Sequence, residues 1–353
     1  MAKTIEVLVV DDSAFMRKML TDILHSTGDI RVSGTARNGL EALKKVREIK
    51  PDVITLDVHM PAMDGLSCLR EIQKITESPV IMLSSMTVDG GKATIEALES
   101  GAIDFITKPA GLFEISGEDK KAEIIEKVRM AYGVMKRKHG RHGTKPEASV
   151  EDKKDRNEKV KALIVIGTST GGPKALQEVI PYIPEDIPAA ILIVQHMPPG
   201  FTKSLADRLN TLSGVNVKEG EDEERIKPGF AYIAPGDFHM EVQTTKDGIM
   251  KLRLTKDNPM GGHRPAVNAL MKSIAKTGFP NVIGVIMTGM GNDGKEGIVS
   301  IKESNNAVII CQDEMSCVVY GMPKSAISTG VVDAIVPLKE IAGVIVKYMG
   351  VEQ

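Results

Sequence analysis

The sequence predicts an α/β protein that is built on parallel sheets and divided into two domains. Its 353 residues exceed the length that one hydrophobic core usually serves. Short β-branched runs alternate with segments of helical period, which is the pattern of strand–helix–strand units. A charged stretch at residues 136–160 separates two groups of such runs. We therefore expect a smaller domain at 1–135, a linker at 136–160 and a larger domain at 161–353.

The first half of the chain contains five expected strands separated by segments of helical period. The strands are IEVLVV (5–10), IRVSGTA (30–36), DVITLD (52–57), PVIMLSS (79–85) and DFITKP (104–109). One helical stripe is formed by Phe15, Met16, Met19, Leu20, Ile23 and Leu24. Together these elements predict a compact five-stranded parallel sheet with helices between its strands.

Residues 136–160 are expected to form a flexible linker. Too few apolar residues are present to bury against another surface, namely Ala148, Val150 and Val160. The basic cluster at the start could be a nucleic-acid patch, and His139 with His142 could bind a metal ion. Interspersed acids and the absence of aromatic residues favour a solvated tether over both alternatives.

The second half of the chain contains a larger set of expected strands. They are ALIVIG (162–167), AAILIVQH (189–196), FAYIAP (230–235), MKLRLTK (250–256), VIGVIMTG (282–289), AVIIC (307–311) and VDAIVP (332–337). The segment from YIAPGDFHM (232–240) to KLRLT (251–255) is compatible with an antiparallel hairpin excursion. The pattern as a whole predicts a doubly wound, mostly parallel α/β domain.

Composition and charge exclude several classes of protein. Hydrophobic residues make up 42% of the chain and charged residues 26%, with a formal net charge of −2, so no general basic excess attracts nucleic acid. Cys68, Cys311 and Cys317 lack CxxC spacing, which argues against a disulfide framework and a zinc site. No apolar run approaches about 18 residues, and the N-terminus does not resemble a signal peptide. We expect a cytoplasmic protein that neither binds nucleic acid nor inserts into a membrane.

Acidic and other polar residues follow the expected strands of the first half. Asp11 and Asp12 come directly after the first strand, and Asp57 ends the third. Ser84 lies at the end of the fourth strand, and Lys108 follows the core of the fifth. Open α/β sheets place their sites at the carboxyl ends of strands, and clustered carboxylates favour a hard cation such as Mg²⁺. Acids at strand ends are also common turn formers, but four suitable strand ends predict a phosphoryl-transfer site.

The motifs VVDDS, LDVHMPAMDG, MLSS and FITKP resemble, in this order, the receiver domain of two-component response regulators over about residues 1–135. This resemblance implies a flavodoxin-like fold in which Asp57 accepts a phosphoryl group. It also implies that Asp12, Asp57 and the backbone carbonyl of His59 bind Mg²⁺, with Asp11 near the ion.

The same resemblance implies contacts to the phosphoryl group. Ser84 and Lys108 would touch it, and Phe105 stands where the family carries its switch aromatic residue. The physical roles agree, because Asp57 can attack an activated phosphorus and the Lys108 ammonium can pair with the new anion. The side chain of His59 is expected to face solvent without a catalytic role.

The stretch IGTSTGG (166–172) joins an expected strand to an expected helix. A P-loop would need Lys where Pro173 stands, and a dinucleotide fingerprint would need Gly where Ser169 stands. Two interpretations remain. The glycines could form a tight turn in which Ser169 or Thr170 caps the helix. Alternatively, the match to G-x-S-x-G exposes the Ser169 hydroxyl as a nucleophile beside helix amides.

A nucleophilic serine needs a base, and two strand ends of the second half supply candidates for a triad. His196 directly follows AAILIVQ, and Asp293 lies in MTGMGNDG, after VIGVIM. A lone histidine is usually structural, and Asn-Asp-Gly is an ordinary turn signal. Convergence at one sheet edge would let Ser169 attack a carbonyl, His196 carry the proton and Asp293 orient the imidazole. His239 and His263 are competitors for the base.

The motifs IGTSTGGPKAL, QHMPPGFTKSLADRL, YIAPGDFHM, HRPAVN, MTGMGNDG and CVVYGMPKSA are similar, in order, to the catalytic domain of the CheB family of chemoreceptor protein-glutamate methylesterases over about 161–350. The resemblance implies hydrolysis of glutamyl methyl esters without a metal or cofactor in this domain. The implied site consists of Ser169, His196, Asp293 and, as oxyanion donor, the backbone amide of Met290. HRPAVN departs from the usual HRPSVD at Ala266 and Asn268, which leaves details of the substrate groove open.

The family also implies partners and regulation. The substrates would be methylated cytoplasmic domains of chemoreceptors, with glutamine deamidation in some members, and the phosphodonor would be the chemotaxis histidine kinase. The unphosphorylated receiver is expected to cover the esterase edge until Asp57 is phosphorylated. A DNA-binding regulator would need a helix-turn-helix or a basic face, which the strand-rich second half lacks. A receptor-binding module without turnover stays open as the alternative.

Overall fold

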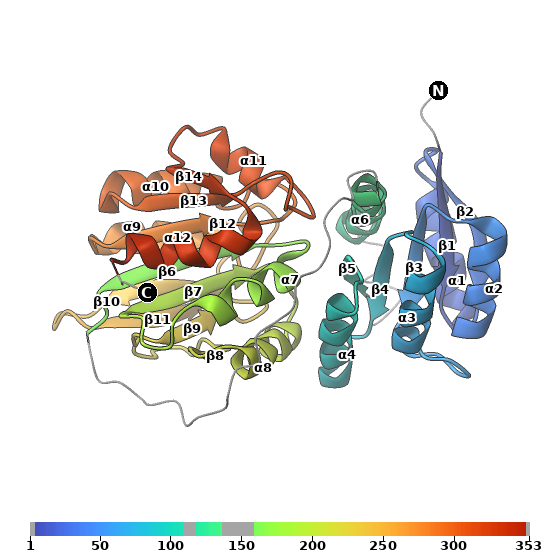
Figure 1. Cartoon of the computed structure of the whole chain (residues 1–353), viewed down its shortest axis with the longest axis horizontal. Coiled ribbons are helices and arrows are strands. Elements are labelled where there is room, and N and C mark those ends of the chain that lie inside the picture. Colours follow the sequence, from blue (N-terminus) through green and yellow to red (C-terminus); the bar gives the residue numbers. More distant parts are fainter. Residues whose placement is uncertain (1–3, 109–117, 136–158, 351–353) are drawn as a thin grey trace. The chain divides into compact units, whose positions relative to one another are not determined.

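A computed structural model describes residues 4–108, 118–135 and 159–350. Contacts divide the chain into two compact units, residues 1–143 and 144–353, and each is described by itself (Figure 1). The stretch 136–158, which contains most of the predicted linker and both His139 and His142, lies outside the described residues. The predicted domain limits therefore stay a prediction. Within the described ranges, no helix is both long and apolar enough to cross a membrane.

The first unit is a five-stranded sheet with helices between its strands. Its strands are β1 (Ile5–Val10), β2 (Ile30–Ala36), β3 (Val53–Asp57), β4 (Val80–Ser84) and β5 (Asp104–Thr107). Its helices are α1 (Ala14–His25), α2 (Gly39–Ile49), α3 (Gly65–Ile75), α4 (Val88–Glu99) and α6 (Glu118–Met135). All neighbouring strands are parallel, in the order β2-β1-β3-β4-β5. The predicted five-stranded parallel fold of flavodoxin-like order is confirmed.

Helix α1 shows how the sequence sets the packing of this unit. Ser13 caps the helix by accepting a hydrogen bond from the Met16 amide over 3.3 Å. Five residues of the predicted stripe are buried: Met16, Met19, Leu20, Ile23 and Leu24. Phe15 is 51% exposed, so its inclusion in the stripe was wrong. At 3.6 residues per turn, Phe15 falls just outside the arc that the other five residues cover.

The second unit is a larger sheet in which every paired strand is parallel to its neighbour. Its strands are β6 (Ala162–Thr168), β7 (Ala189–Gln195), β8 (Asn216–Glu219), β9 (Phe230–Ile233), β12 (Val282–Ile286), β13 (Val308–Gln312) and β14 (Ala334–Val336). The order is β14-β13-β12-β6-β7-β9-β8. The helices of this unit are α7 (Gly172–Gln177), η1 (Ile180–Tyr182), α8 (Phe201–Leu212), α9 (Val267–Thr277), α10 (Lys295–Asn305), α11 (Met322–Ile327), η2 (Leu338–Glu340) and α12 (Ile341–Tyr348). The predicted mostly parallel α/β domain is confirmed.

The antiparallel excursion is smaller than the sequence suggested. Strands β10 (His239–Thr244) and β11 (Met250–Thr255) form a separate two-stranded antiparallel sheet. The residues FAYI (230–233), which include the first part of the expected hairpin, belong instead to β9 of the parallel sheet. Strand β8 was not predicted, because NVKE (216–219) is short, polar and lacks a run of β-branched residues.

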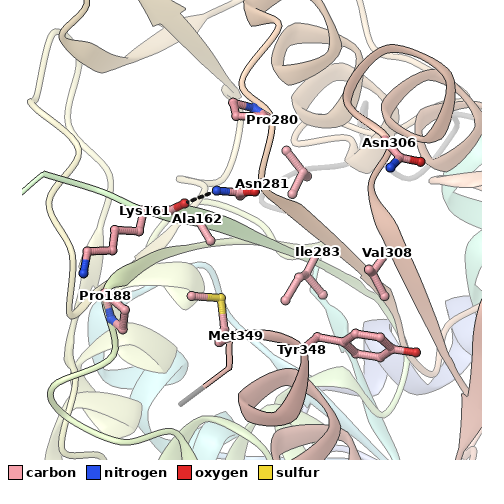
Figure 2. A pocket seen from close by; sticks show the side chains of 11 residues that line it. Lys161, Ala162, Pro188, Pro280, Asn281, Ile283, Asn306, Val308, Tyr348 and Met349 are labelled. Carbon is pink, nitrogen blue, oxygen red and sulfur yellow. Dashed lines mark hydrogen bonds between the residues drawn. The ribbon is translucent and has the colours of Figure 1, made fainter.

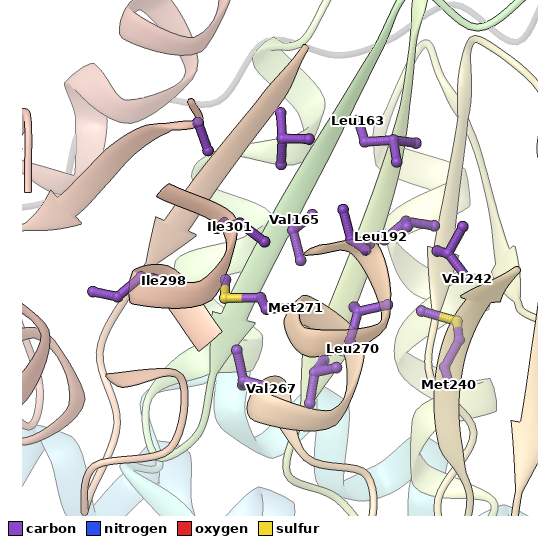
Figure 3. Close-up of a cluster of buried hydrophobic side chains, with 14 of the residues drawn as sticks. Leu163, Val165, Leu192, Met240, Val242, Val267, Leu270, Met271, Ile298 and Ile301 are labelled. Atoms are coloured by element: carbon purple, nitrogen blue, oxygen red, sulfur yellow. The ribbon is translucent and has the colours of Figure 1, made fainter. Parts of the chain in front are cut away.

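The core of the second unit lies between the sheet, the hairpin and helices α9 and α10. Strands β6 and β7 are buried along their whole length, which explains their continuous apolar sequences. Figure 3 shows the side chains that meet there, among them Leu163, Val165, Leu192, Met240, Val242, Val267, Leu270, Met271, Ile298 and Ile301. The elements that carry the predicted site are therefore anchored in one continuous core.

Both sheets contain a topological switch point, where the first strand of the sheet has later strands on both of its sides. In the second unit, β6 pairs with β7 on one side and with β12 on the other. In the first unit, β1 lies between β2 and β3 in the same way. Open α/β sheets bind their ligands at the carboxyl ends of the strands that flank such a point.

Candidate functional site

Ser169 comes directly after β6, at the carboxyl edge of the larger sheet. Its amide donates to the Thr288 carbonyl over 3.1 Å, and its side chain is half-buried. Gly289 packs against it so closely that an added Cβ would lie 2.9 Å from the Ser169 Cβ. Helix α7 begins after Gly171 and has no side-chain cap. The alternative interpretation, in which Ser169 or Thr170 caps this helix, is therefore wrong.

His196 and Asp293 form a hydrogen-bonded pair at the same edge. His196 follows β7, and its Nε2 lies 2.8 Å from Oδ2 of Asp293. The pairing of Thr168 with Gln195 makes Ser169 and His196 the next residues on two neighbouring strands. The Nδ1 atom of His196 has no hydrogen-bond partner among the described residues. The ring therefore uses one nitrogen for Asp293 and leaves the other without a partner among the described residues, as a base would require.

The Asp293 carboxylate is held by backbone amides as well as by His196. It accepts hydrogen bonds from the amides of Val267 at 2.6 Å, Asn268 at 2.9 Å and Gly294 at 2.9 Å. Burial alone would raise the pKa of Asp293, but the hydrogen bond and charge of His196 and the amides lower it below the usual 3.8. Asp293 is therefore an anion at neutral pH, as an orienting residue requires.

Gln195 links the ends of β6 and β7, and no motif in the sequence indicated this role. Its Nε2 donates to the carbonyls of Ser169 at 3.0 Å and His196 at 3.2 Å. Its Oε1 accepts a hydrogen bond from the Thr168 hydroxyl. The residue is 2% exposed. A buried amide at the end of an apolar run was the available signal, because such groups almost always have partners.

The loop after β12 contains the expected oxyanion donor. The Gly289 amide donates to the Val319 carbonyl over 3.1 Å, which fixes the start of the loop. Met290 follows and is half-buried, and its amide donates to no described residue. This amide is available to an external acceptor, although its role at an oxyanion stays a prediction.

The two residues at which HRPAVN departs from HRPSVD, Ala266 and Asn268, lie in the segment whose backbone amides bind the Asp293 carboxylate. Ala266 is fully buried and occupies the N-cap position of α9, so this helix has no side-chain cap. The Asn268 Oδ1 accepts the amides of Gly294 and Gly297 over 3.2 and 2.8 Å, at the start of α10. Asn268 therefore supports the loop that carries Asp293.

The other histidines of this unit occupy different positions. His239 is 2% exposed at the start of β10, with its Nε2 3.2 Å from the Asn258 carbonyl oxygen. The ring of His263 stacks on the ring of His196, with centroids 3.9 Å apart and planes 10° from parallel. His263 thus covers one face of the His196 ring, whereas His239 lies at the start of the hairpin.

The carboxyl edge of the smaller sheet gathers the predicted acids of the first unit. Carboxylate oxygens of Asp11, Asp12 and Asp57 all lie within 4.8 Å of one another. The ammonium group of Lys108 lies 2.8 Å from Oδ2 of Asp11 and 2.7 Å from Oδ2 of Asp57. Three carboxylates balanced by one lysine leave an excess of negative charge, and the all-oxygen donor set fits a hard divalent cation.

Burial and charge shift the protonation of this cluster. Burial raises the pKa of Asp57 above its usual 3.8, and Lys108 offsets this only in part. Burial would lower the pKa of Lys108, but its hydrogen bonds and ion pairs with Asp11 and Asp57 raise it above the usual value. Gly65 is required behind the site, because an added Cβ would lie 2.0 Å from the Asp57 carbonyl oxygen.

The other predicted receiver residues surround this cluster. The Lys108 amide donates to the Ser84 carbonyl over 2.7 Å, while the Ser84 hydroxyl donates to the Gly90 carbonyl over 3.1 Å. The His59 amide donates to Oδ1 of Asp57 over 3.3 Å, and its side chain is exposed. Phe105 is buried, with its ring 5.1 Å from the Lys127 ammonium. A phosphoryl contact of Ser84 and a metal contact of the His59 carbonyl stay predictions.

The cysteines do not join either site as metal ligands. All three are free; Cys68 and Cys311 are buried, and burial raises the pKa of both thiols to about 12. Among the described residues, only Asp11, Asp12 and Asp57 form a group of potential metal ligands.

A cavity of about 350 Å³ lies at the opposite edge of the larger sheet. It opens at the amino ends of β6, β12 and β13, beside Lys161, Asn281 and Tyr348 (Figure 2). Its edge of the sheet is the one away from Ser169, His196 and the loop after β12. This cavity is therefore separate from the predicted catalytic site.

Comparison with known proteins decides the family. A family model for CheB methylesterase matches residues 164–345, which is more than half of the chain. The chain belongs to the CheB methylesterase family. A second model, the response regulator receiver domain, matches residues 7–117. Both resemblances noted in the sequence are confirmed.

Relatives of this family match over nearly the whole chain. A protein-glutamate methylesterase/protein-glutamine glutaminase 1 from Syntrophomonas wolfei is 47% identical over 95% of this chain and 97% of the relative. A protein-glutamate methylesterase/protein-glutamine glutaminase from Halalkalibacterium halodurans is 47% identical over 98% of this chain and 99% of the relative. The crystal structure of the Thermotoga maritima CheB methylesterase catalytic domain superposes with a TM-score of 0.51 at 45% identity. It covers 53% of this chain and 97% of that domain.

Proposed function

We propose that this protein is a protein-glutamate methylesterase that hydrolyses glutamate methyl esters on chemoreceptors under the control of phosphorylation at Asp57. The observation that carries the proposal is the hydrogen bond between His196, after β7, and Asp293, in the loop after β12, beside Ser169 at the end of β6. Family membership supplies the ester as the substrate class. Deamidation of receptor glutamines, which the names of the relatives include, uses the same acyl transfer with ammonia as the leaving group.

The proposed reaction begins at the Ser169 hydroxyl. Its oxygen attacks the ester carbonyl while Nδ1 of His196 takes the proton, and Asp293 stabilises the resulting imidazolium through Nε2. The tetrahedral oxyanion accepts hydrogen bonds from loop amides, among which Met290 is available. Collapse breaks the bond to methoxide, which leaves as methanol with the proton from His196.

The second half of the reaction frees the enzyme. A water molecule attacks the glutamyl–Ser169 ester while His196 takes one of its protons. The new tetrahedral intermediate expels the Ser169 oxygen, which recovers the proton from His196. The receptor side chain leaves as a free glutamic acid, which then ionises. Each cycle therefore consumes one water and releases one methanol.

The first unit supplies the proposed control. The carboxylates of Asp11, Asp12 and Asp57 would hold Mg²⁺, which when bound neutralises charge around an incoming phosphoryl group. An Asp57 oxygen would attack the phosphorus of a phosphohistidine on the chemotaxis histidine kinase. A P–O bond would form as the P–N bond breaks, and the kinase histidine would leave as a neutral imidazole after taking up a proton from water. Lys108, already beside Asp57, would then pair with the phosphoryl oxygens. The proposed partners, methylated chemoreceptors and this kinase, place the protein in the cytoplasm.

Methanol release from methylated chemoreceptor membranes tests the chemistry directly. The full chain should release methanol, and Ser169→Ala should reduce the release at least about 10³-fold with folding unchanged. Ser328→Ala is a matched control, because Ser328 is an exposed serine of the same unit. No release by the unchanged chain, combined with retained receptor binding, would favour a binding module. Unchanged release by Ser169→Ala would refute the assignment of the nucleophile.

A further inference from the structure

The catalytic imidazole has one restrained edge and one restrained face. Its edge is fixed at Nε2 by the 2.8 Å hydrogen bond to Asp293. Its face is covered by the ring of His263, whose centroid lies 3.9 Å away and whose plane is 10° from parallel. From the sequence alone, His263 is only a competitor for the base. Its observed place, face to face with His196, indicates another role.

One hydrogen bond does not define the plane of an imidazole. The χ2 torsion of histidine is broad and weakly restrained. A ring held at Nε2 alone can swing about the Nε2–Oδ2 line, which moves Nδ1 away from the direction needed to take a proton. A flat group packed against the ring face removes this freedom. Small errors of this kind have large effects, because a misplacement of about 1 Å can reduce a rate about 100-fold.

We propose that His263 is a positioning residue for catalysis, whose flat ring fixes the plane of His196 and so keeps Nδ1 directed at Ser169. This inference rests on the proposed function of the Ser169 site. It requires a planar side chain at position 263 and does not require either of its nitrogens. It assigns His263 no contact with substrate.

The loop before α9 is built to deliver this ring. Met260 and His263 exchange two backbone hydrogen bonds of 3.0 Å, which closes a two-residue turn. Both residues inside the turn are glycines with positive φ, +59° at Gly261 and +82° at Gly262. A type I′ turn needs this conformation at both positions, and glycine adopts it without strain. The position of His263 is therefore set by the backbone.

The residues after His263 anchor the same loop on both sides. The Arg264 guanidinium donates to Oδ1 of Asp237 at 2.6 and 3.1 Å and to the carbonyls of Lys256 and Asp257 at 3.1 Å. Further along, the amides of Val267 and Asn268 bind the Asp293 carboxylate. One short segment thus holds the partner of His196 and also covers the His196 ring.

Two other roles for His263 fit the geometry poorly. Proton exchange with His196 would need edge nitrogens of the two rings in line with each other, whereas stacked rings present their faces to each other. A general contribution to the core is disfavoured because His263 is half-buried in a turn, outside the hydrophobic cluster.

Substitution at position 263 of the full chain tests the inference through a comparison of flat and non-flat side chains. His263→Phe keeps a flat ring without nitrogens, and His263→Leu removes the flat face while filling similar space. We expect His263→Leu to lower kcat for methanol release by about 10- to 100-fold, with KM within about twofold. We expect His263→Phe to stay within about threefold of the unchanged chain. If His263→Leu folds poorly, as seen by circular dichroism, His263→Ala carries the same expectation.

Each contrary result overturns the proposal. Equal losses in the Phe and Leu variants would show that an imidazole nitrogen is needed. An unchanged kcat in His263→Leu would show that the ring plane is fixed by other groups. A change confined to KM would identify a substrate contact instead.

A second readout separates this inference from the proposed substrate. Phosphonylation of Ser169 by a fluorophosphonate probe depends on activation of the serine and does not need a methyl ester. If the unchanged chain reacts with the probe but releases no methanol, the proposed substrate is wrong. The labelling rates of the Leu and Phe variants then still decide the role of His263, with the same expected order.

Discussion

The two units use the same topological position to hold an acid, but they hold it in opposite ways. Asp293, in the larger unit, is bound by His196 and by backbone amides that together lower its pKa. Asp57, in the smaller unit, is buried beside Asp11, and its pKa is raised because Lys108 only partly offsets the effect of burial. A sheet edge can therefore build either a balanced anion or an anion that still needs a cation.

This difference matches the two proposed tasks. A triad acid acts in every turnover without changing its own state, so it benefits from complete pairing. An acid that is to be modified benefits from an environment in which a metal ion or covalent change alters the balance of charge. The following predictions test whether the contrast between Asp293 and Asp57 is functional.

The largest expected effect is the loss of kcat on substitution of Asp293. Asp293→Asn keeps the size of the side chain but removes the anion that fixes the tautomer of His196. We expect kcat for methanol release to fall by about 10⁴-fold, the size typical of this change in a triad. Asp207→Asn, at an exposed acid on α8 paired with Lys203, should leave kcat unchanged. A loss below about tenfold would show that Asp293 does not orient the base.

The second-largest expected effect concerns Asp57 and the stimulation of methanol release by phosphorylation. Addition of Mg²⁺ and a small-molecule phosphodonor should raise methanol release by a factor in the range of about 5 to 150, typical of coupling between two sites. Asp57→Asn should remove this rise while keeping the basal rate. Asp22→Asn, at an exposed acid of α1, should keep it. If stimulation persists in Asp57→Asn, phosphorylation acts elsewhere or the phosphodonor acts by another route.

A smaller effect is expected at the support of the triad. Gln195→Leu leaves the carbonyls of Ser169 and His196 without the donors that now join them. We expect kcat to fall about tenfold as the two strand ends separate, because unsatisfied buried carbonyls favour rearrangement. Gln243→Leu, at a half-buried glutamine of the hairpin whose Nε2 donates to Glu223, is the control. Equal behaviour of the two variants would show that Gln195 only fills space.

Much of the fold and the outline of both sites could be predicted from the sequence for a physical reason. Buried parallel strands are continuous apolar runs, so the polar residues that follow each run mark a carboxyl end. Ser169, His196 and Asp57 stand at such positions, and topology brings strand ends together. Strand β8 could not be predicted in this way because its residues are polar, and its existence depends on pairing with β9.

The supporting contacts could not be predicted in the same way. Gln195 lies far in the sequence from Ser169, and Asp293 lies far from the Val267 and Asn268 amides, so no local spacing connects them. The stacking of His263 depends on a turn whose direction follows from tertiary packing. Phe15 was wrongly assigned to the buried stripe of α1 because it is apolar, although its angular position lies just outside the arc of the other five residues.

The smallest expected effect is on stability. It tests the opposite pKa shifts of Asp293 and Asp57 without measuring catalysis. The folded pKa of Asp293 lies below the usual 3.8, so its anion stabilises the fold above that pH, and this contribution is lost as pH falls through the folded pKa. The folded pKa of Asp57 lies above 3.8, so ionisation destabilises the fold at neutral pH, and this penalty disappears as pH falls through the folded pKa.

The same substitution should therefore shift stability in opposite directions at pH 7. Asp293→Asn should destabilise the second unit by about 1–3 kcal/mol through the loss of charged hydrogen bonds. Asp57→Asn should stabilise the first unit by on the order of 1 kcal/mol, a shift of several degrees in its unfolding temperature. Calorimetry of the full chain without Mg²⁺, at pH 7 and again at pH 4, measures both, and the contrast should shrink at the lower pH. Shifts of the same sign at pH 7 would show that Asp57 is as well paired as Asp293, and the proposed distinction between a fixed acid and a switchable acid would then lose its electrostatic basis.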